Sequence, residues 1–287
     1  MSETQYKPTV AYLGPEASFT HIAATTLFGS AGLVPQPTIP DCIEAVEEGK
    51  VAYAIVPLEN ALEGSVPMTI DYLFHGSELF INAEISMAIE QHLMVNKKMK
   101  EKSGQIESIH SHPVALAQCH KYLQYHYRRT PLMQTTSTAA AAKHVSENPE
   151  LSIAAIGNRL AAEKYNLHIA EENIHDFHFN HTRFVVLSLR KGHLDLPNHS
   201  ERAKTTLMVK LPEDDRSGVL HQILSVFAWR KLNLSKIESR PMKTGLGNYF
   251  FIIDVMENEE QPMMKGALEE LAALNCSVRS FGSYYTY

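Results

Sequence analysis

The sequence has few cysteines, and none of them is placed to form a disulfide framework. Cys42, Cys119 and Cys276 lie far apart among 287 residues, in neither a CxxC pair nor the closely spaced even set of a small secreted domain. Unpaired cysteine usually packs as a small hydrophobic side chain. We therefore expect three buried free thiols.

Long hydrophobic runs and dense basic runs are also missing. The formal charge is −6 and the Lys and Arg residues are scattered, whereas binding to a nucleic-acid backbone depends on clustered cations. Residues 1–9 are polar and lead into only a short apolar stretch, which fits neither a secretory signal nor a membrane span. These absences argue against nucleic acid and membrane as partners and predict a cytoplasmic protein.

Motifs for cofactors and covalent catalysis are incomplete. The Gly-Leu-Gly segment at 245–247 completes neither GxGxxG nor GxxxxGK[ST], so we interpret it as a hairpin turn rather than a phosphate loop. His175, His178 and His181 recur every third residue on an irregular segment, a spacing that defines no metal geometry. Cys119 precedes a histidine, but adjacent helical residues point in different directions, which disfavours a thiol nucleophile. We expect no metal and no cofactor.

Short apolar runs alternate with helix-period segments between residues 9 and 189. This order is typical of βαβ units that build a mostly parallel sheet, so the expected class is α/β. The length of the chain fits more than one folding unit. The expected strands are at 9–13, 51–57, 106–110, 132–135, 152–156 and 182–189, and the expected helices are at 19–28, 43–48, 66–74, 114–125 and 138–146.

A second folding unit is expected after a linker. Residues 192–203 include Pro197, Asn198 and several charged residues without periodicity, as linkers between cores do. The segments beyond it read strand, helix, strand, strand, helix, strand, which is the βαββαβ order of a ferredoxin-like domain. These segments are 204–211, 218–230, 234–240, 249–256, 263–274 and 277–284. We place the α/β region at 1–191 and the small domain at 204–287.

Several helices of the α/β region begin with hydroxyl or capping residues. Such starts leave free N–H groups and a partial positive charge, an arrangement that can hold a carboxylate. Plain capping explains any one of them, but several helix starts that each follow a strand suggest an anion site, because ligands of open sheets bind beyond the C-terminal strand ends. The starts are Ser18 with Thr20, Ser65, Ser111, and Ser137 with Thr138.

Two polar stretches lie at the ends of expected strands. The first follows a buried strand and includes Glu59 and Asn60, a combination that a purely structural turn does not need. The second, with Thr182, Arg183 and Phe184, leads into a strongly apolar strand. Alternation along a strand places Thr182 and Phe184 on one face and Arg183 on the other. We expect the two faces to have different roles.

These residues, in this order, resemble the prephenate dehydratases, and the similarity covers nearly the whole chain. The motifs are Gly-Pro-Glu-Ala-Ser-Phe-Thr at 14–20, the block 59–65, Ser-His-Pro at 111–113 with Gln118, Ser-Thr-Ala-Ala at 137–140, and Thr-Arg-Phe at 182–184. The tail resembles the phenylalanine-binding ACT domain through Gly-Val-Leu at 218–220 and Glu-Ser-Arg-Pro at 238–241.

The resemblance implies a fold and a reaction. The fold would be two α/β lobes around a cleft, like a periplasmic binding protein, with one lobe from about 1–80 and 180–191 and the other from 81–179. The reaction would remove carbon dioxide and water from prephenate to give phenylpyruvate in L-phenylalanine biosynthesis, without a metal or organic cofactor. Because the ring becomes aromatic, the protein would mainly assist the leaving hydroxyl.

The resemblance also implies roles for individual residues. Thr182 would lie beside the leaving hydroxyl and polarise it, with the proton arriving through Glu59 or water. Arg183, on the opposite face, would support the site indirectly. The implied catalytic set is Thr182, Glu59, Asn60, Ser111 and Gln118, and the substrate-binding set is Ser18, Thr20, Ser65, Ser137, Thr138, Arg183 and Phe184.

For the C-terminal part, the resemblance implies feedback inhibition. Two ACT domains would pair side by side in a homodimer or homotetramer and bind L-phenylalanine at their interface. Gly218, without a side chain, would let the effector approach the backbone at a helix start, and Asn233 would be a polar partner. The implied effector set is Gly218, Val219, Leu220, Asn233, Glu238, Ser239, Arg240 and Pro241.

Two other functions fit parts of the pattern. A two-lobed binding protein without catalysis is one, since a fold does not define a function, but such receptors are usually exported and no export signal is visible. A transferase of the ATP phosphoribosyltransferase kind is the other, but it needs a phosphate-binding glycine loop. Formation of phenylpyruvate from prephenate distinguishes all three.

Overall fold

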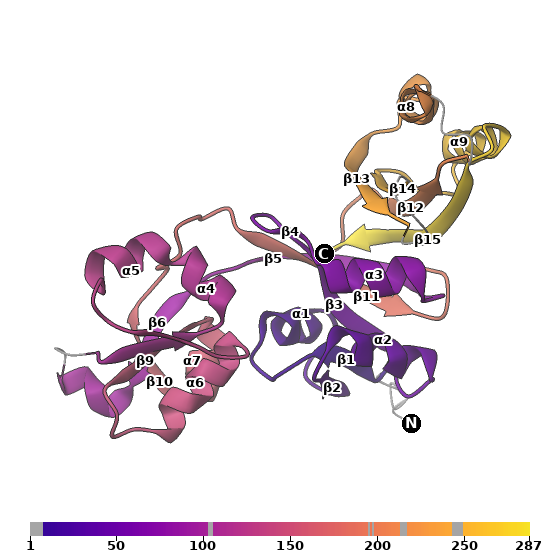
Figure 1. Cartoon of the computed structure of the whole chain (residues 1–287). Helices are drawn as coiled ribbons and strands as arrows, with labels where there is room; N and C mark the ends of the chain where they lie inside the picture. The colour runs from indigo at the N-terminus through magenta and orange to yellow at the C-terminus, as the bar shows by residue number, and fades with distance from the viewer. Residues whose placement is uncertain (1–7, 103–105, 195, 197, 213–216, 243–248) are drawn as a thin grey trace, which may run out of the picture.

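The computed structural model describes residues 8–102, 106–194, 196, 198–212, 217–242 and 249–287. In Figure 1 the chain forms two lobes side by side and a smaller C-terminal domain. The C-terminal domain, in orange and yellow, stands on the lobe that contains the N-terminal segment, in indigo and purple. We call these parts lobe 1, which contains the N-terminal segment, lobe 2 and the C-terminal domain.

Lobe 1 is a mixed sheet covered by helices on both faces. Its strands are β1 (Val10–Leu13), β2 (Leu33–Gln36), β3 (Tyr53–Asn60), β5 (Phe80–Ala88) and β11 (His181–Ser188), with the short β4 (Gly64–Ser65) beside β3, and its helices are α1 (Phe19–Phe28), α2 (Ile39–Glu47) and α3 (Pro67–His75). The order is β5-β11-β3-β1-β2, with β11 antiparallel to both neighbours. Helix α1 packs on one face and α2 and α3 on the other, so Val10, Ala11 and Tyr12 are all buried.

Lobe 2 is a second, smaller mixed sheet. Its strands are β6 (His92–Asn96), β7 (Ser108–Ser111), β8 (Leu132–Gln134), β9 (Ile153–Gly157) and β10 (Leu167–Glu171), and its helices are α4 (Pro113–Gln118), α5 (His120–His126), α6 (Thr138–Glu147), α7 (Arg159–Lys164) and a short 3-10 turn at Lys97–Lys102. The order is β10-β6-β9-β7-β8, with β7 parallel to β8 and β9. The chain enters after β5 and returns before β11, where Ile89 N donates to Asn180 O at 2.9 Å.

The C-terminal domain has the predicted βαββαβ order. Its elements are β12 (Lys204–Lys210), α8 (Val219–Trp229), β13 (Leu234–Pro241), β14 (Tyr249–Val255), α9 (Pro262–Ala273) and β15 (Ser277–Thr286). The sheet order is β13-β14-β12-β15, and β15 also pairs in parallel with β5 of lobe 1 through Tyr285 and Thr286. One continuous ten-stranded sheet therefore joins the C-terminal domain to lobe 1.

The predicted fold class is confirmed, while several element predictions need correction. Helix α1 matches its predicted range, but α2 begins four residues early because Thr38 and Asp41 form a capping box there. The single helix expected at 114–125 is two helices that meet at Cys119. The sheets are mixed rather than mostly parallel, and β2, β5, β6, α7 and β10 were not predicted.

All three cysteines are free and buried, as predicted. None of the helices in the described ranges combines the length and the apolar character needed to cross a bilayer.

Candidate active site

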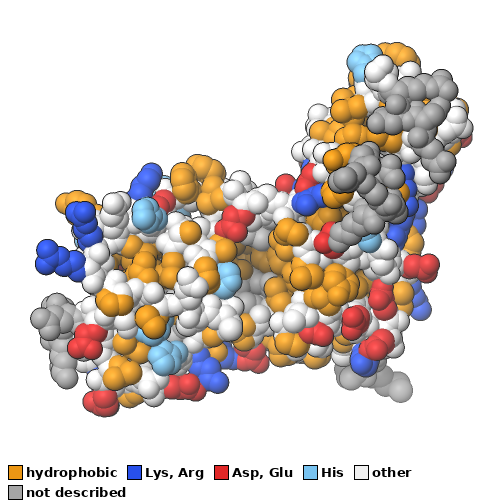
Figure 2. Space-filling model, in the orientation of Figure 1, with side chains coloured by type: hydrophobic (Ala, Val, Ile, Leu, Met, Phe, Trp, Pro, Cys, Tyr) orange, Lys and Arg blue, Asp and Glu red, His pale blue; other side chains and the backbone are white. Residues whose placement is uncertain are grey.

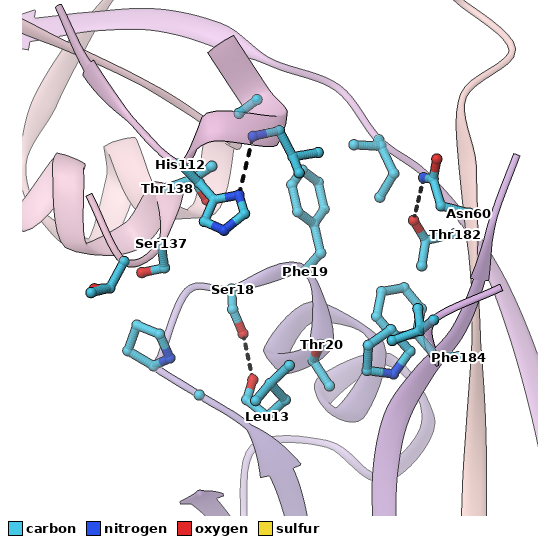
Figure 3. A pocket seen from close by; sticks show the side chains of 18 of the residues that line it. Leu13, Ser18, Phe19, Thr20, Asn60, His112, Ser137, Thr138, Thr182 and Phe184 are labelled. Atoms are coloured by element: carbon cyan, nitrogen blue, oxygen red, sulfur yellow. Dashed lines mark hydrogen bonds between the residues drawn. The ribbon is translucent and has the colours of Figure 1, made fainter. Parts of the chain in front are cut away.

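A cavity of about 440 Å³ lies between the two lobes. In Figure 2 the surface is hollowed there, and the C-terminal domain stands to one side of the hollow. Figure 3 shows that side chains from both lobes point toward it, including Phe19, Thr182 and Phe184 from lobe 1 and His112 and Ser137 from lobe 2. A ligand in this cavity would contact both lobes at once.

Thr182 and Asn60 lie together in the lobe 1 wall of the cavity. Their strands pair antiparallel with these two residues opposite each other, and Asn60 Nδ2 donates to Thr182 Oγ1 at 2.9 Å. Asn60 Oδ1 accepts from the Leu62 and Glu63 backbone N–H groups at 2.9 and 3.2 Å, which defines the orientation of the amide. Because Thr182 Oγ1 is already an acceptor, its own hydrogen is available to a ligand.

Two helices begin at the cavity wall. Ser18 caps α1 by accepting from His21 N at 3.2 Å, and Ser137 caps α6 by accepting from Ala140 N at 3.0 Å. Thr138, the first residue of α6, lines the cavity with Ser137. Helix starts carry free N–H groups and a partial positive charge, and both favour an anion.

No Lys or Arg is among the described residues that line the cavity. Apolar groups, including Phe19, Phe184, Pro57 and Ile89, form much of its wall. An anion in this cavity would thus be held by uncharged donors and helix starts. Such donors give hydrogen bonds to charged groups worth about 1.5–3 kcal/mol each.

Gln118 links the two lobes at the cavity. Its Nε2 donates to Glu63 Oε1 of lobe 1 at 3.2 Å, and its Oε1 accepts from Gln91 Nε2 at 3.4 Å. Sequence reasoning predicted Gln118 but missed Gln91, Glu63, His112 and Phe19 as lining residues. Glu63, His112 and Phe19 lie inside the motifs that carry the resemblance, so these motifs could have identified them. Gln91 lies outside every motif, and no feature of the sequence marked it.

The cavity brings together most of the predicted site residues, although their roles remain predictions. Those that line it are Thr182, Asn60, Gln118, Ser18, Thr20, Ser137, Thr138 and Phe184. Four predicted residues are not in the lining, namely Glu59, Ser65, Ser111 and Arg183.

Glu59 faces away from the cavity. It precedes Asn60 on β3, and alternation along the strand directs the two side chains to opposite faces. Its carboxylate accepts from Arg183 Nη1 at 2.6 Å and pairs with Lys236 Nζ of the C-terminal domain at 2.8 Å. The predicted delivery of a proton by Glu59 does not fit this placement.

Ser65 and Ser111 are also committed elsewhere. Ser65 Oγ donates to Glu238 Oε2 at 2.5 Å and accepts from Lys236 Nζ at 2.7 Å, both in the C-terminal domain. Ser111 is fully buried at the end of β7, and its Oγ donates to Ile156 O at 2.7 Å. Direct substrate contact by either hydroxyl is not supported by this arrangement.

Arg183 lies opposite Thr182, on the face that the alternation predicted. Its guanidinium contacts Glu84 at 2.6 Å and Asp254 at 2.8 Å, in addition to Glu59. Burial alone would lower the pKa of Arg183, but the Glu84 and Asp254 charges outweigh burial and raise that pKa. The indirect supporting role fits this position, whereas membership of the substrate-binding set does not.

Metal and thiol chemistry find no support in the described residues. No group of three His, Cys, Asp or Glu side chains among them could hold a metal ion. His175 Nδ1 instead accepts from Gln91 N at 3.3 Å. Burial raises the pKa of the Cys119 thiol, which disfavours the nucleophilic thiolate.

The predicted effector residues lie on α8 and β13 of the C-terminal domain, except that Gly218 and Asn233 directly precede these elements. Gly218 has φ +94° at the start of α8, a left-handed conformation that glycine adopts at little cost. Glu238 and Arg240 form an ion pair of 2.5 Å on β13, which is an edge strand of the sheet. Within the described residues β13 pairs with β14 alone, so its other side is available to pair with another strand.

Known protein families match both parts of the chain. The model of the family "Prephenate dehydratase" matches residues 10–192, and that of "ACT domain" matches residues 205–280. The chain belongs to the prephenate dehydratase family. The prephenate dehydratase of Bacillus subtilis (strain 168) is 51% identical over 281 residues, which is 97% of this chain and 99% of that protein.

Solved structures match this chain over nearly its whole length. A prephenate dehydratase from Arthrobacter aurescens in complex with L-Phe is 34% identical, with a TM-score of 0.83 over 96% of this chain and 89% of that one. A protein named GqqA, described as a novel type of quorum quenching acylase, is 27% identical, with a TM-score of 0.81 over 97% and 98%. One architecture in this group therefore carries two different activity names.

Proposed function

We propose that this chain converts prephenate to phenylpyruvate, carbon dioxide and water as a step in L-phenylalanine synthesis. The observation that carries the proposal is the cavity between the lobes, where Asn60 orients the Thr182 hydroxyl and uncharged donors replace cations. Prephenate is a doubly negative cyclohexadiene with a ring hydroxyl, and these features match that lining. No cofactor is part of the proposal.

The reaction needs help at one position. The bond from the ring to its carboxylate breaks, and its electron pair enters the ring as the bond to the hydroxyl oxygen breaks. The hydroxyl takes one proton from a water molecule in the cleft and leaves as water, and the hydroxide left in the cleft takes a proton from the solvent. Because Asn60 occupies an acceptor position on Thr182 Oγ1, the Thr182 hydroxyl donates toward the departing oxygen and polarises it.

The helix starts and Gln118 would hold the two carboxylates. The α1 and α6 N-termini contribute Ser18, Thr20, Ser137 and Thr138, and Gln118 contributes an amide from lobe 2. A lining without Lys or Arg suits the chemistry, because a cation on the departing carboxylate would stabilise the ground state. Several neutral hydrogen bonds bind the dianion without that cost.

We also propose L-phenylalanine as a feedback inhibitor that binds the C-terminal ACT domain. The Arthrobacter relative is described in complex with L-Phe, and its structure covers nearly all of this chain. The effector residues would be those predicted on α8 and β13. Side-by-side pairing of two β13 edges would form a homodimer or homotetramer. A cytoplasmic location and domain limits of 1–191, 192–203 and 204–287 belong to the same proposal.

Acyl hydrolysis, the activity in the name of GqqA, is less well supported. It would need a nucleophile activated by a base. Ser18 Oγ donates to Leu13 O at 3.0 Å, and Ser137 Oγ serves as a helix cap. His112 Nδ1 accepts from Val114 N at 3.3 Å rather than from a hydroxyl. This pattern favours binding and polarisation over covalent catalysis.

A direct assay tests the proposal. Purified protein is incubated with prephenate, and phenylpyruvate is followed by its absorbance in alkali, with acyl homoserine lactones as the competing substrates. We expect phenylpyruvate to form well above the uncatalysed rate and phenylalanine to inhibit its formation. Phenylpyruvate at only the uncatalysed rate would overturn the proposal, and release of the free acyl chain by amide cleavage in its place would favour the acylase.

A further inference from the structure

Charged side chains form a buried cluster where the C-terminal domain meets lobe 1. Lys204 pairs with Glu84 at 2.7 Å, and Arg183 joins Glu84 to Asp254. Side-chain exposure is 1% at Asp254 and 3% at Glu84, so water screens these charges little. We call this the interface ion cluster, which comprises Arg183, Glu59 and Glu84 of lobe 1 and Lys204, Lys236 and Asp254 of the C-terminal domain.

Lys236 reaches the active-site strand β3 from the regulatory side. Its Nζ lies 2.8 Å from Glu59 Oε1, 2.7 Å from Ser65 Oγ and 3.1 Å from Glu238 Oε2. The side chain is 10% exposed. Two of its partners belong to lobe 1, whereas Glu238 belongs to the motif proposed to bind phenylalanine.

Glu59 is held between the two domains. One oxygen pairs with Lys236, and the other accepts from Arg183 Nη1 at 2.6 Å. In the register of β3 and β11, Glu59 lies opposite Arg183 and Asn60 lies opposite Thr182. Two neighbouring residue pairs of the sheet therefore serve opposite faces. The Glu59–Arg183 pair forms the ion pair on one face, and the Asn60–Thr182 pair forms the hydrogen bond on the cavity face. A shift of the ionic face displaces the cavity face.

We infer that Lys236 is a positioning residue for the active site, and that it transmits phenylalanine binding at the ACT domain to Thr182 through Glu59. The inference rests on the proposed function and its regulation. An effector that moves β13 draws Lys236 away from Glu59. The Lys236 and Glu59 side chains are 10% and 27% exposed, so breaking their contact removes one charged partner from each where water screens the charges only in part. The contact therefore favours two discrete states over a gradual change.

The test separates phenylalanine binding from phenylalanine inhibition. In the full chain, Lys236→Met is compared with the parent for kcat/KM with prephenate at increasing phenylalanine, while equilibrium dialysis measures phenylalanine binding. We expect Lys236→Met to bind phenylalanine. Without phenylalanine its kcat/KM should be at least tenfold below that of the parent, because the contact that phenylalanine breaks is already absent, and added phenylalanine should lower it little further. Lys236→Arg, which retains the charge, should restore both the activity without phenylalanine and its inhibition by phenylalanine.

Two further variants make the result decisive. Glu59→Gln changes the lobe 1 side of the contact. It should also have at least tenfold lower kcat/KM without phenylalanine and be inhibited little further by it, while phenylalanine binding persists. Lys191→Met is the matched control, because Lys191 pairs with Glu259 of the C-terminal domain at 2.9 Å near the opposite end of β11. It should be inhibited like the parent.

The outcomes distinguish the inference from the function on which it rests. A parent that makes no phenylpyruvate, or that phenylalanine does not inhibit, overturns the proposed function or its regulation. If the parent does both and Glu59→Gln has the parent's activity and inhibition, the inference is overturned. This holds even where Lys236→Met has lost phenylalanine binding or does not fold. Equal loss of inhibition in Lys191→Met also overturns it, because domain docking in general would then be the cause.

Discussion

At the scale of single residues, neighbours in the sequence have separate tasks. Thr182 and Asn60 face the cavity, whereas Arg183 and Glu59, each one position away, face the C-terminal domain. Alternation along β3 and β11 produces this division. Substitutions at adjacent positions should therefore affect different properties.

Thr182→Ala should lower kcat by about 10² to 10⁴, because assistance to a leaving oxygen typically contributes that much. The melting temperature should change little, and Thr182→Ser, which retains the hydroxyl, should retain most of the activity. Steady-state kinetics with prephenate measure the effect. Turnover of Thr182→Ala within roughly tenfold of the parent would show that Thr182 does not assist the hydroxyl.

Arg183→Met should affect stability first. It leaves Glu59, Glu84 and Asp254 without a shared cation, and breaking a buried pair typically costs about 3–5 kcal/mol. Urea denaturation measures the loss. The matched control is Lys98→Met, which removes an exposed pair with Glu150 and should cost at most about 1 kcal/mol. A pure loss of substrate affinity in Arg183→Met, with unchanged stability, would contradict this role.

At the scale of elements, helix starts connect stability with binding. Helix α6 begins at the cavity, and its cap, Ser137, is also one of the lining residues. A cap stabilises the helix whether or not a ligand is present, whereas an anion site depends on the sign of the charge placed there. One substitution can separate these two contributions.

Ser137→Asp should retain the cap but weaken substrate binding. Aspartate caps a helix about as well as serine, so the melting temperature should be close to that of the parent. The added carboxylate faces a dianion, so KM for prephenate should rise at least about tenfold, which corresponds to roughly 1.4 kcal/mol. Ser137→Ala, the comparison variant, should lose about 1 kcal/mol of stability. An unchanged KM in Ser137→Asp would exclude the α6 start from the carboxylate site.

At the scale of the whole molecule, one sheet and one ion cluster join regulation to catalysis. The pairing of β15 with β5 continues the sheet of lobe 1 into the C-terminal domain. The interface ion cluster lies beside this junction, since Glu84 belongs to β5 and Arg183 to β11. Conditions that titrate the cluster should loosen the domain contact.

Acid should destabilise this contact. Burial would raise the pKa of Glu84, but the charges of Arg183 and Lys204 outweigh burial and lower it from 4.5. The unfolded chain therefore takes up the proton first, so the stabilisation is complete above pH 4.5 and is lost as the pH falls through the lower folded pKa. Melting followed by circular dichroism between about pH 7 and pH 3 should show a decline confined to the acidic end. A flat profile there would exclude a stabilising role for this carboxylate.

Much of the architecture could be predicted from local signals. The α1 range follows from its Ser18 cap and the glycine that ends it, and the βαββαβ order follows from hydrophobic periodicity. Strand β5 was missed because the polar residues Asn82 and Glu84 interrupt its apolar pattern, and their burial depends on tertiary partners such as Arg183 and Lys204 for Glu84. The alternation that separated Thr182 from Arg183 also applies to Glu59 and Asn60, and applying it there would have placed Glu59 outside the cavity.

The sequence by itself determined the α/β class, the order of motifs and the family, because these depend on short-range patterns along the chain. Only the tertiary structure decided that Gln91 and Glu63 meet at Gln118, and that Lys236 of the C-terminal domain reaches Glu59. Such contacts join residues far apart in the chain. They form only when the lobes and domains pack together, so no local pattern encodes them.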